Sequence, residues 1–201
     1  MDYELVPLSQ LNDDGIKQLA VLHHSVMRTL LADLGLPMVL RYYQVARSDK
    51  SVIGICAMNS SKEILGWAMG SPHPDRINSG LRTPLAWFMR QMLRLAFTRP
   101  LVLWQLIASV LSFSAEPEMK SDAIELTYIG VASDQRGKGL GKDLLIAFID
   151  ASQEKGYRSV VLSVEKENES AIALYKKAGF KITRTFSEGR YERHRMELTL
   201  E

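Results

Sequence analysis

Hydrophobic positions along the chain switch between a two-residue and a 3.6-residue period, a pattern that predicts strands alternating with helices. One helical stripe of apolar residues runs from Ile16 to Leu34, and Gly35 and Pro37 follow it in the order typical of a helix end. The other runs predict strands at 3–8, 51–58, 64–70, 124–131, 159–164, 180–186 and 191–200, and helices at 38–47, 140–155 and 170–178. This order predicts an α/β fold.

A glycine-rich turn at 136–142 separates the strand predicted at 124–131 from the helix predicted at 140–155. At such a turn, free backbone N–H groups and the positive end of the helix can bind a phosphate. The spacing differs from the dinucleotide-binding fingerprint, because Lys142 stands where the third glycine is required. It also differs from a P-loop. That motif needs glycine at position 136 and serine or threonine at position 143, where this chain has Arg136 and Asp143.

Two segments carry a resemblance to a known family. Residues 130–141 read GVASDQRGKGLG, and residues 168–180 read NESAIALYKKAGF. Together they resemble the GNAT N-acetyltransferase superfamily, whose acyl-CoA turn is matched by Arg136, Gly139 and Gly141. The resemblance implies a mixed, mostly antiparallel central sheet flanked by helices, within a single domain over 1–201. It also implies acetyl-CoA as the co-substrate.

The resemblance assigns binding roles to both segments. It places the pyrophosphate of acetyl-CoA on the N–H groups of 136–142, and the pantetheine arm beside the strand at 129–131. Asn168 corresponds to the family asparagine that binds pantetheine or the neighbouring strand, although a helix cap would have the same sequence. The expected co-substrate-binding residues are Ile129, Gly130, Val131, Arg136, Gly137, Lys138, Gly139, Leu140, Gly141, Lys142, Asn168 and Tyr175.

Acyl transfer from a thioester to an amine needs a neutral amine, a polarised carbonyl and a proton for the leaving thiolate. The resemblance implies that a backbone N–H near Val131 polarises the carbonyl and that Tyr175 protonates the sulfur. An unshifted tyrosine, with a pKa of about 10, is protonated at neutral pH and can donate. The alternative for Tyr175 is an aromatic residue that packs its helix against the sheet.

The expected base is Glu125, which precedes Arg136 by the spacing at which several family members place a catalytic glutamate. Period-two alternation predicts that Glu125 shares a face of its strand with Thr127 and Ile129. A half-buried carboxylate there could accept a proton through water. A salt-bridged or edge-facing glutamate is the alternative.

Composition excludes several other kinds of site. A single cysteine, Cys56, cannot form an intramolecular disulfide, and no zinc cluster or other metal site is expected. Cys56 lies in a predicted strand, where packing is its expected role. His23, His24 and His73 are weaker candidates for acid–base chemistry than for surface or interface positions. The net charge of +2 predicts no nucleic-acid partner, and the acidic start of the chain predicts a cytoplasmic protein without a secretory signal.

An unusual helical insertion at about 72–120 precedes the motif strand. From Arg76 to Ala115 the chain has five arginines and no acidic residue. Its core, 84–115, predicts two helices divided by Pro100. The second run is too short for the roughly 20 apolar residues that span a membrane.

The first of these two helices is amphipathic, with Arg90 and Arg94 opposite an apolar stripe formed by Leu85, Phe88, Met89, Met92, Leu93 and Ala96. With Trp87 and Trp104, the two helices could form a lid over the acceptor site or a homodimer contact. They could also form a peripheral element on the inner membrane surface.

The combined features predict an N-acetyltransferase that acts on a primary amine of a small molecule. The arginines of the insertion suit an anionic acceptor, for example an amino sugar on a nucleotide or polyprenyl phosphate, as in surface-polysaccharide assembly. A protein or peptide N-terminal acetyltransferase is the first alternative. The second is a non-catalytic acyl-CoA-binding or membrane-docked protein.

Overall fold

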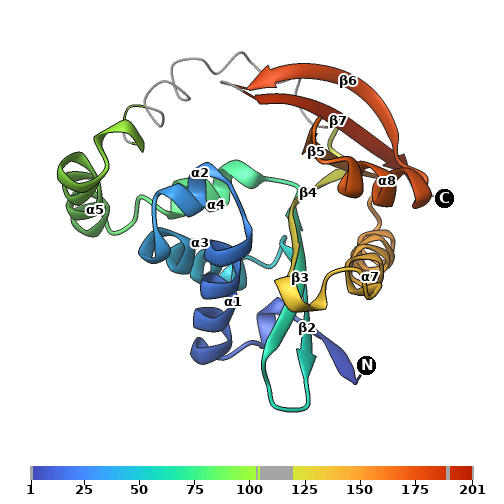
Figure 1. Cartoon of the computed structure of the whole chain (residues 1–201), viewed down its shortest axis with the longest axis horizontal. Coiled ribbons are helices and arrows are strands. Elements are labelled where there is room, and N and C mark those ends of the chain that lie inside the picture. Colours follow the sequence, from blue (N-terminus) through green and yellow to red (C-terminus); the bar gives the residue numbers. More distant parts are fainter. Residues whose placement is uncertain (1, 103, 105–119, 189–190, 201) are drawn as a thin grey trace.

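The computed structural model describes residues 2–102, 104, 120–188 and 191–200, and its strands form one mixed sheet (Figure 1). The order is β1-β2-β3-β4-β5-β7-β6, and β4–β5 is the one parallel pair among these described strands. The strands are β1 (Tyr3–Pro7), β2 (Ile53–Asn59), β3 (Ile64–Ser71), β4 (Ala123–Val131), β5 (Ser159–Glu165), β6 (Lys181–Glu188) and β7 (Tyr191–Thr199). The predicted mixed, mostly antiparallel α/β fold is confirmed.

Helices cover both faces of this sheet and create two hydrophobic cores. On one face lie α1 (Asp13–Val26), α2 (Leu30–Asp33) and α3 (Leu36–Ser48), whose apolar side chains pack with Trp67 and Met69 of β3. On the other face lie α7 (Leu140–Glu154) and α8 (Glu169–Lys177), which pack with Ile124 and Leu126 of β4. Because neighbouring residues of β4 contribute to different cores, this strand lies between both sets of helices.

The single helix predicted from Ile16 to Leu34 is wrong, because the chain breaks between α1 and α2. Met27 is extended, and the Thr29 side chain accepts a hydrogen bond from the Ala32 N–H at 3.3 Å, which caps α2. A further short helix, α4 (Pro74–Gly80), is absent from the sequence-based prediction. Its proline lies in the first turn, where the missing N–H costs no helical hydrogen bond.

Within the insertion, the first predicted helix is confirmed as α5 (Leu85–Thr98). The second, after Pro100, falls almost entirely outside the described residues. Of the predicted apolar stripe, Phe88 and Met92 pack against the α1–α3 core, whereas Leu85, Met89 and Leu93 are exposed. Gln91 and Leu95 are the most buried residues of α5. No helix in the described ranges is long and apolar enough to cross a membrane.

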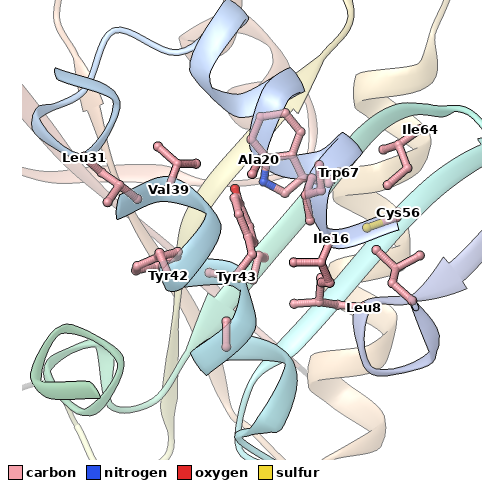
Figure 2. Packing of buried hydrophobic residues seen from close by; sticks show 14 of the residues in the cluster. Leu8, Ile16, Ala20, Leu31, Val39, Tyr42, Tyr43, Cys56, Ile64 and Trp67 are labelled. Carbon is pink, nitrogen blue, oxygen red and sulfur yellow. The ribbon is translucent and has the colours of Figure 1, made fainter. Parts of the chain in front are cut away.

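Two polar or reactive side chains lie in the core beneath α1 and α3. His23 is fully buried, with Nδ1 hydrogen-bonded to the Tyr43 hydroxyl at 2.7 Å and Nε2 to the Thr29 hydroxyl at 3.4 Å. Tyr43 and Cys56 belong to the same packed cluster (Figure 2). Burial raises the pKa of the Cys56 thiol to about 12, which removes it as a nucleophile and confirms its packing role.

Burial of His23 predicts loss of stability in mild acid. Desolvation, with a smaller contribution from His24, lowers the pKa of His23 from 6.5 to about 4. Between these values the unfolded chain binds more protons, so the free energy of unfolding should fall as pH decreases from 6.5 to 4, by about 3 kcal/mol in total. Urea unfolding at several pH values measures this slope. His23→Phe should flatten it, whereas His24→Gln, which removes only the smaller contribution to the lowered pKa of His23, should reduce the slope slightly.

Candidate active site

The parallel strands β4 and β5 separate after their first residues. Their paired positions end at Glu125, which lies opposite Val161, whereas β4 continues to Val131 and β5 to Glu165. Beyond Glu125, the edge of β4 that faces β5 therefore has no strand partner among the described residues. A ligand with amide groups can pair with such an edge as an added strand.

A β-bulge in β4 accompanies this divergence. Met69 of β3 pairs with Tyr128, but the next residue, Gly70, pairs with Leu126, so Thr127 is an extra residue on β4. A bulge bends its strand and strengthens the local twist. It thereby helps to turn the end of β4 away from β5.

The bulge also corrects the prediction that Glu125 shares a face with Ile129. Ile124 and Leu126 pack in the core under α7 and α8, so Glu125 between them faces the α1–α3 side. After the extra residue the alternation is inverted: Ile129 packs with the α7–α8 core, whereas Tyr128 packs with the α1–α3 core. Period-two reasoning failed here because it assumes an unbroken strand.

Glu125 is held by an ion pair that the sequence analysis did not identify. Its Oε1 and Oε2 accept hydrogen bonds from the two terminal nitrogens of Arg195, at 2.8 and 3.3 Å. The Arg195 nitrogen that contacts Oε1 also donates to Ser163 Oγ at 3.0 Å. The side chains of Glu125 and Arg195 are only 21% and 15% exposed. Glu125 therefore occupies the point where β4 and β5 separate, in the salt-bridged state that the sequence left open.

Two tyrosines lie on the same side of β4 as Glu125. The rings of Tyr42, from α3, and Tyr128 meet edge to face with centroids 5.6 Å apart. Desolvation, together with the nearby Tyr128 and Glu125, raises the pKa of Tyr42 well above 10. Sequence reasoning missed both residues, because aromatic positions on a helix and a strand do not reveal that they meet.

The glycine-rich turn leads from β4 into the first turn of α7. Gly139 caps the helix with φ +91°, and Gly137 also has positive φ, a backbone conformation that favours glycine. Within the described part of the chain, no N–H group of 136–141 donates to a backbone or side-chain acceptor. A Cβ atom at Gly137 or Gly139 would meet nothing within 4 Å. The turn thus offers free donors and open space, which fit the pyrophosphate of acetyl-CoA.

The remaining predicted turn residues differ in burial. Leu140 is buried and anchors α7 in the core, whereas Arg136, Lys138 and Lys142 are exposed. Lys138 donates to the Gln135 side chain at 3.4 Å. These cationic side chains are therefore accessible at the turn, and the predicted role of Lys138 and Lys142 in binding pyrophosphate stays a prediction.

Asn168 and Tyr175 come from α8. The Asn168 side chain accepts hydrogen bonds from the Ala171 N–H at 3.2 Å and the Ser170 hydroxyl at 3.1 Å, so it caps the helix. Tyr175 is 6% exposed and packs beside Phe180, and burial raises its pKa to about 12. Asn168 therefore caps α8, and Tyr175 packs in the core and keeps its proton at neutral pH. Their roles in co-substrate binding and proton transfer stay predictions.

The end of β4, the turn and α8 converge at Gly141. A Cβ atom built there would lie 3.7 Å from Val131 and 3.9 Å from Leu174, the residue before Tyr175. Segments that carry the two sequence motifs are therefore in contact. Gly130 and Glu125, by contrast, face the α1–α3 side of β4.

Gly130 provides a test of this packing. A Cβ at position 130 would lie 2.5 Å from the Trp67 ring, which is buried and cannot move aside easily. Gly130→Ala should therefore lower the free energy of unfolding by roughly 1–3 kcal/mol, measured by urea denaturation. Gly141→Ala, whose Cβ would find ordinary contact distances, should cause no such loss. Equal stability of both variants would contradict the packing described.

A comparison with known families identifies the family of this chain. The profile described as the acetyltransferase (GNAT) family matches residues 22–180. The chain belongs to the acetyltransferase (GNAT) family. Membership confirms the family resemblance of the two motifs, and with it the prediction of an acyltransferase enzyme. Acetyl-CoA is the co-substrate of this GNAT family.

Curated relatives match this GNAT protein over a short segment. A mycothiol acetyltransferase of Renibacterium salmoninarum is 45% identical over 56 residues, which are 28% of this chain and 17% of the relative. An L-methionine sulfoximine/L-methionine sulfone acetyltransferase of Pseudomonas paraeruginosa is 42% identical over 53 residues, 26% of this chain and 31% of the relative. The chain thus spans less than a third of either relative.

Solved structures share the fold over the whole chain. An N-acetyltransferase from Staphylococcus aureus Mu50 superposes with a TM-score of 0.64 and 16% identity, covering 100% of both chains. At this identity the likeness shows the fold and nothing finer.

Proposed function

We propose that this GNAT protein transfers the acetyl group of acetyl-CoA to a primary amine of a small molecule. The observation that carries the proposal is the continuity of two features. The unpaired edge of β4 begins at Glu125 and leads directly into a turn whose N–H groups, 136–141, have no acceptor in the described structure. The first feature suits the amides of pantetheine and the second its pyrophosphate.

In the proposed reaction the amine nitrogen attacks the thioester carbon, the new C–N bond forms and the C–S bond breaks. A backbone N–H near Val131 stabilises the negative charge that develops on the carbonyl oxygen. Tyr175 donates its phenolic proton to the leaving sulfur, because a pKa of about 12 keeps that proton in place. The proton of the attacking amine goes through water to Glu125.

For the acceptor, we propose an amine on an anionic small molecule, such as an amino sugar linked to a phosphate. Five arginines and no acid between Arg76 and Ala115 support an anionic partner. One curated relative is named for a small-molecule acceptor, L-methionine sulfoximine, which supports a small molecule rather than a protein as the acceptor. A peptide N-terminus remains the second candidate.

The proposal is tested by following CoA thiol release with acetyl-CoA and a panel of amines. The panel contains amino sugars, nucleotide-linked amino sugars, polyamines, amino acids and short peptides. Turnover that is fastest with a phosphate-bearing amino sugar supports the whole proposal. Turnover with peptides alone supports the second candidate. Binding of acetyl-CoA by calorimetry without turnover on any amine would favour a binding protein.

A further inference from the structure

The insertion helix α5 presents an apolar stripe to solvent. Its exposed members lie four residues apart at Leu85, Met89, Leu93 and Phe97, and Leu101 and Trp104 follow. Phe97 is 82% exposed and Trp104 67%. Each step of four residues rotates by only about 40° around a helix, so the first four side chains share one side of α5. Scattered single apolar residues are ordinary on a surface, whereas a contiguous stripe marks a contact.

This stripe is separate from the side of α5 that holds the helix to the protein. Gln91 and Leu95 are buried, and Trp87, Phe88 and Met92 pack against the α1–α3 core. The helix is therefore already anchored without the exposed stripe, which is available for another partner.

Positive charge borders the stripe. Arg90 and Arg94 are exposed and lie between its apolar side and the buried side of the helix. Arg94 and Arg99 also line a cavity of about 210 Å³ between α5 and the start of α3, together with His24 and Gln91. Arg99 reaches the Asp33 carbonyl oxygen at 3.2 Å across this cavity. Apolar side chains flanked by guanidinium groups match the boundary between acyl chains and anionic headgroups.

We propose that α5 docks this protein on a membrane surface that contains anionic phospholipid, with Leu85, Met89, Leu93 and Phe97 in the acyl-chain boundary. Arg90 and Arg94 then contact headgroup phosphates. A second copy of this chain fits the stripe less well as a partner. A two-fold contact through the stripe would bring the arginines of both copies close together, and the segment from Arg76 to Ala115 has no acidic residue to pair with them. Helix α5 lies at the opposite end of the molecule from α7, so docking leaves the glycine-rich turn free (Figure 1).

The test is cosedimentation of the full chain with vesicles of phosphatidylcholine and phosphatidylglycerol in equal parts, compared with vesicles of phosphatidylcholine alone. The wild type should bind the anionic vesicles more tightly, and high salt should weaken this binding. Leu93→Glu/Phe97→Glu should reduce the affinity for the anionic vesicles about tenfold or more. The variant loses two apolar side chains that insert into the membrane and gains two negative charges, which the anionic lipid repels. Val21→Glu, which alters an exposed apolar residue on α1, should bind as the wild type does.

A second pair of variants tests the arginines. Arg90→Glu/Arg94→Glu should abolish the preference for anionic vesicles, whereas Lys176→Glu/Lys177→Glu, with the same change in net charge but at the end of α8, should retain it. An equal loss of this preference in both double variants would overturn the proposal, because the attraction to anionic vesicles would then depend on the overall charge of the protein. A dimer in light scattering without lipid, dissociated by Leu93→Glu/Phe97→Glu, would also overturn it and assign the stripe to a second copy.

Discussion

Replacing Tyr175 by phenylalanine is expected to lower kcat for acetyl transfer by roughly 10²–10⁴-fold, the usual contribution of a positioned general acid. The ring and its contact with Phe180 remain, so the fold and the affinity for acetyl-CoA should change little. Only the phenolic proton is lost. Because burial raises the Tyr175 pKa to about 12, the wild-type enzyme retains this proton throughout the neutral and mildly alkaline range.

The matched control is Tyr157→Phe. Tyr157 is a half-buried tyrosine whose pKa is likewise raised by burial, but it follows α7 at the end remote from the glycine-rich turn. Steady-state kinetics, calorimetric binding of acetyl-CoA and thermal unfolding should separate the two variants. If Tyr175→Phe retained kcat, Tyr175 would be a packing residue, and the proton for the sulfur would have to come from elsewhere.

The glycine-rich turn and α8 were predictable because their signals are local. Glycine at 137 and 139 adopts positive φ, and Asn168 caps the helix that begins beside it. Such features depend on a few consecutive residues. Their contact through Gly141 was not predicted, because it joins segments that lie far apart in the sequence.

The environment of Glu125 was not predictable, because it depends on pairings between distant strands. The extra residue at Thr127 appears only in the register with β3, and Arg195 reaches Glu125 from β7 across Ser163 of β5. No periodicity within β4 carries this information. The buried side of α5 was not predictable from sequence either, because Gln91 is polar but belongs to it.

Glu125→Gln should lower kcat/KM by roughly 10²–10⁴-fold at neutral pH if the carboxylate accepts the amine proton. It should also destabilise the fold by about 1–3 kcal/mol, less than for a fully buried pair, because Arg195 loses a charged partner that is partly exposed. Loss of activity alone would therefore not distinguish a base from a structural ion pair.

Arg195→Met separates these roles, because it breaks the same ion pair but keeps the carboxylate. A base at Glu125 predicts that Arg195→Met retains much more activity than Glu125→Gln, although both variants unfold at lower urea concentrations. It further predicts that the activity of Glu125→Gln rises more steeply with pH than that of the wild type, since more of the acceptor amine becomes neutral without help from a base. Equal activity losses in both variants, with no such rise, would show that Glu125 acts only by fixing β4 to β5 and β7 through Arg195.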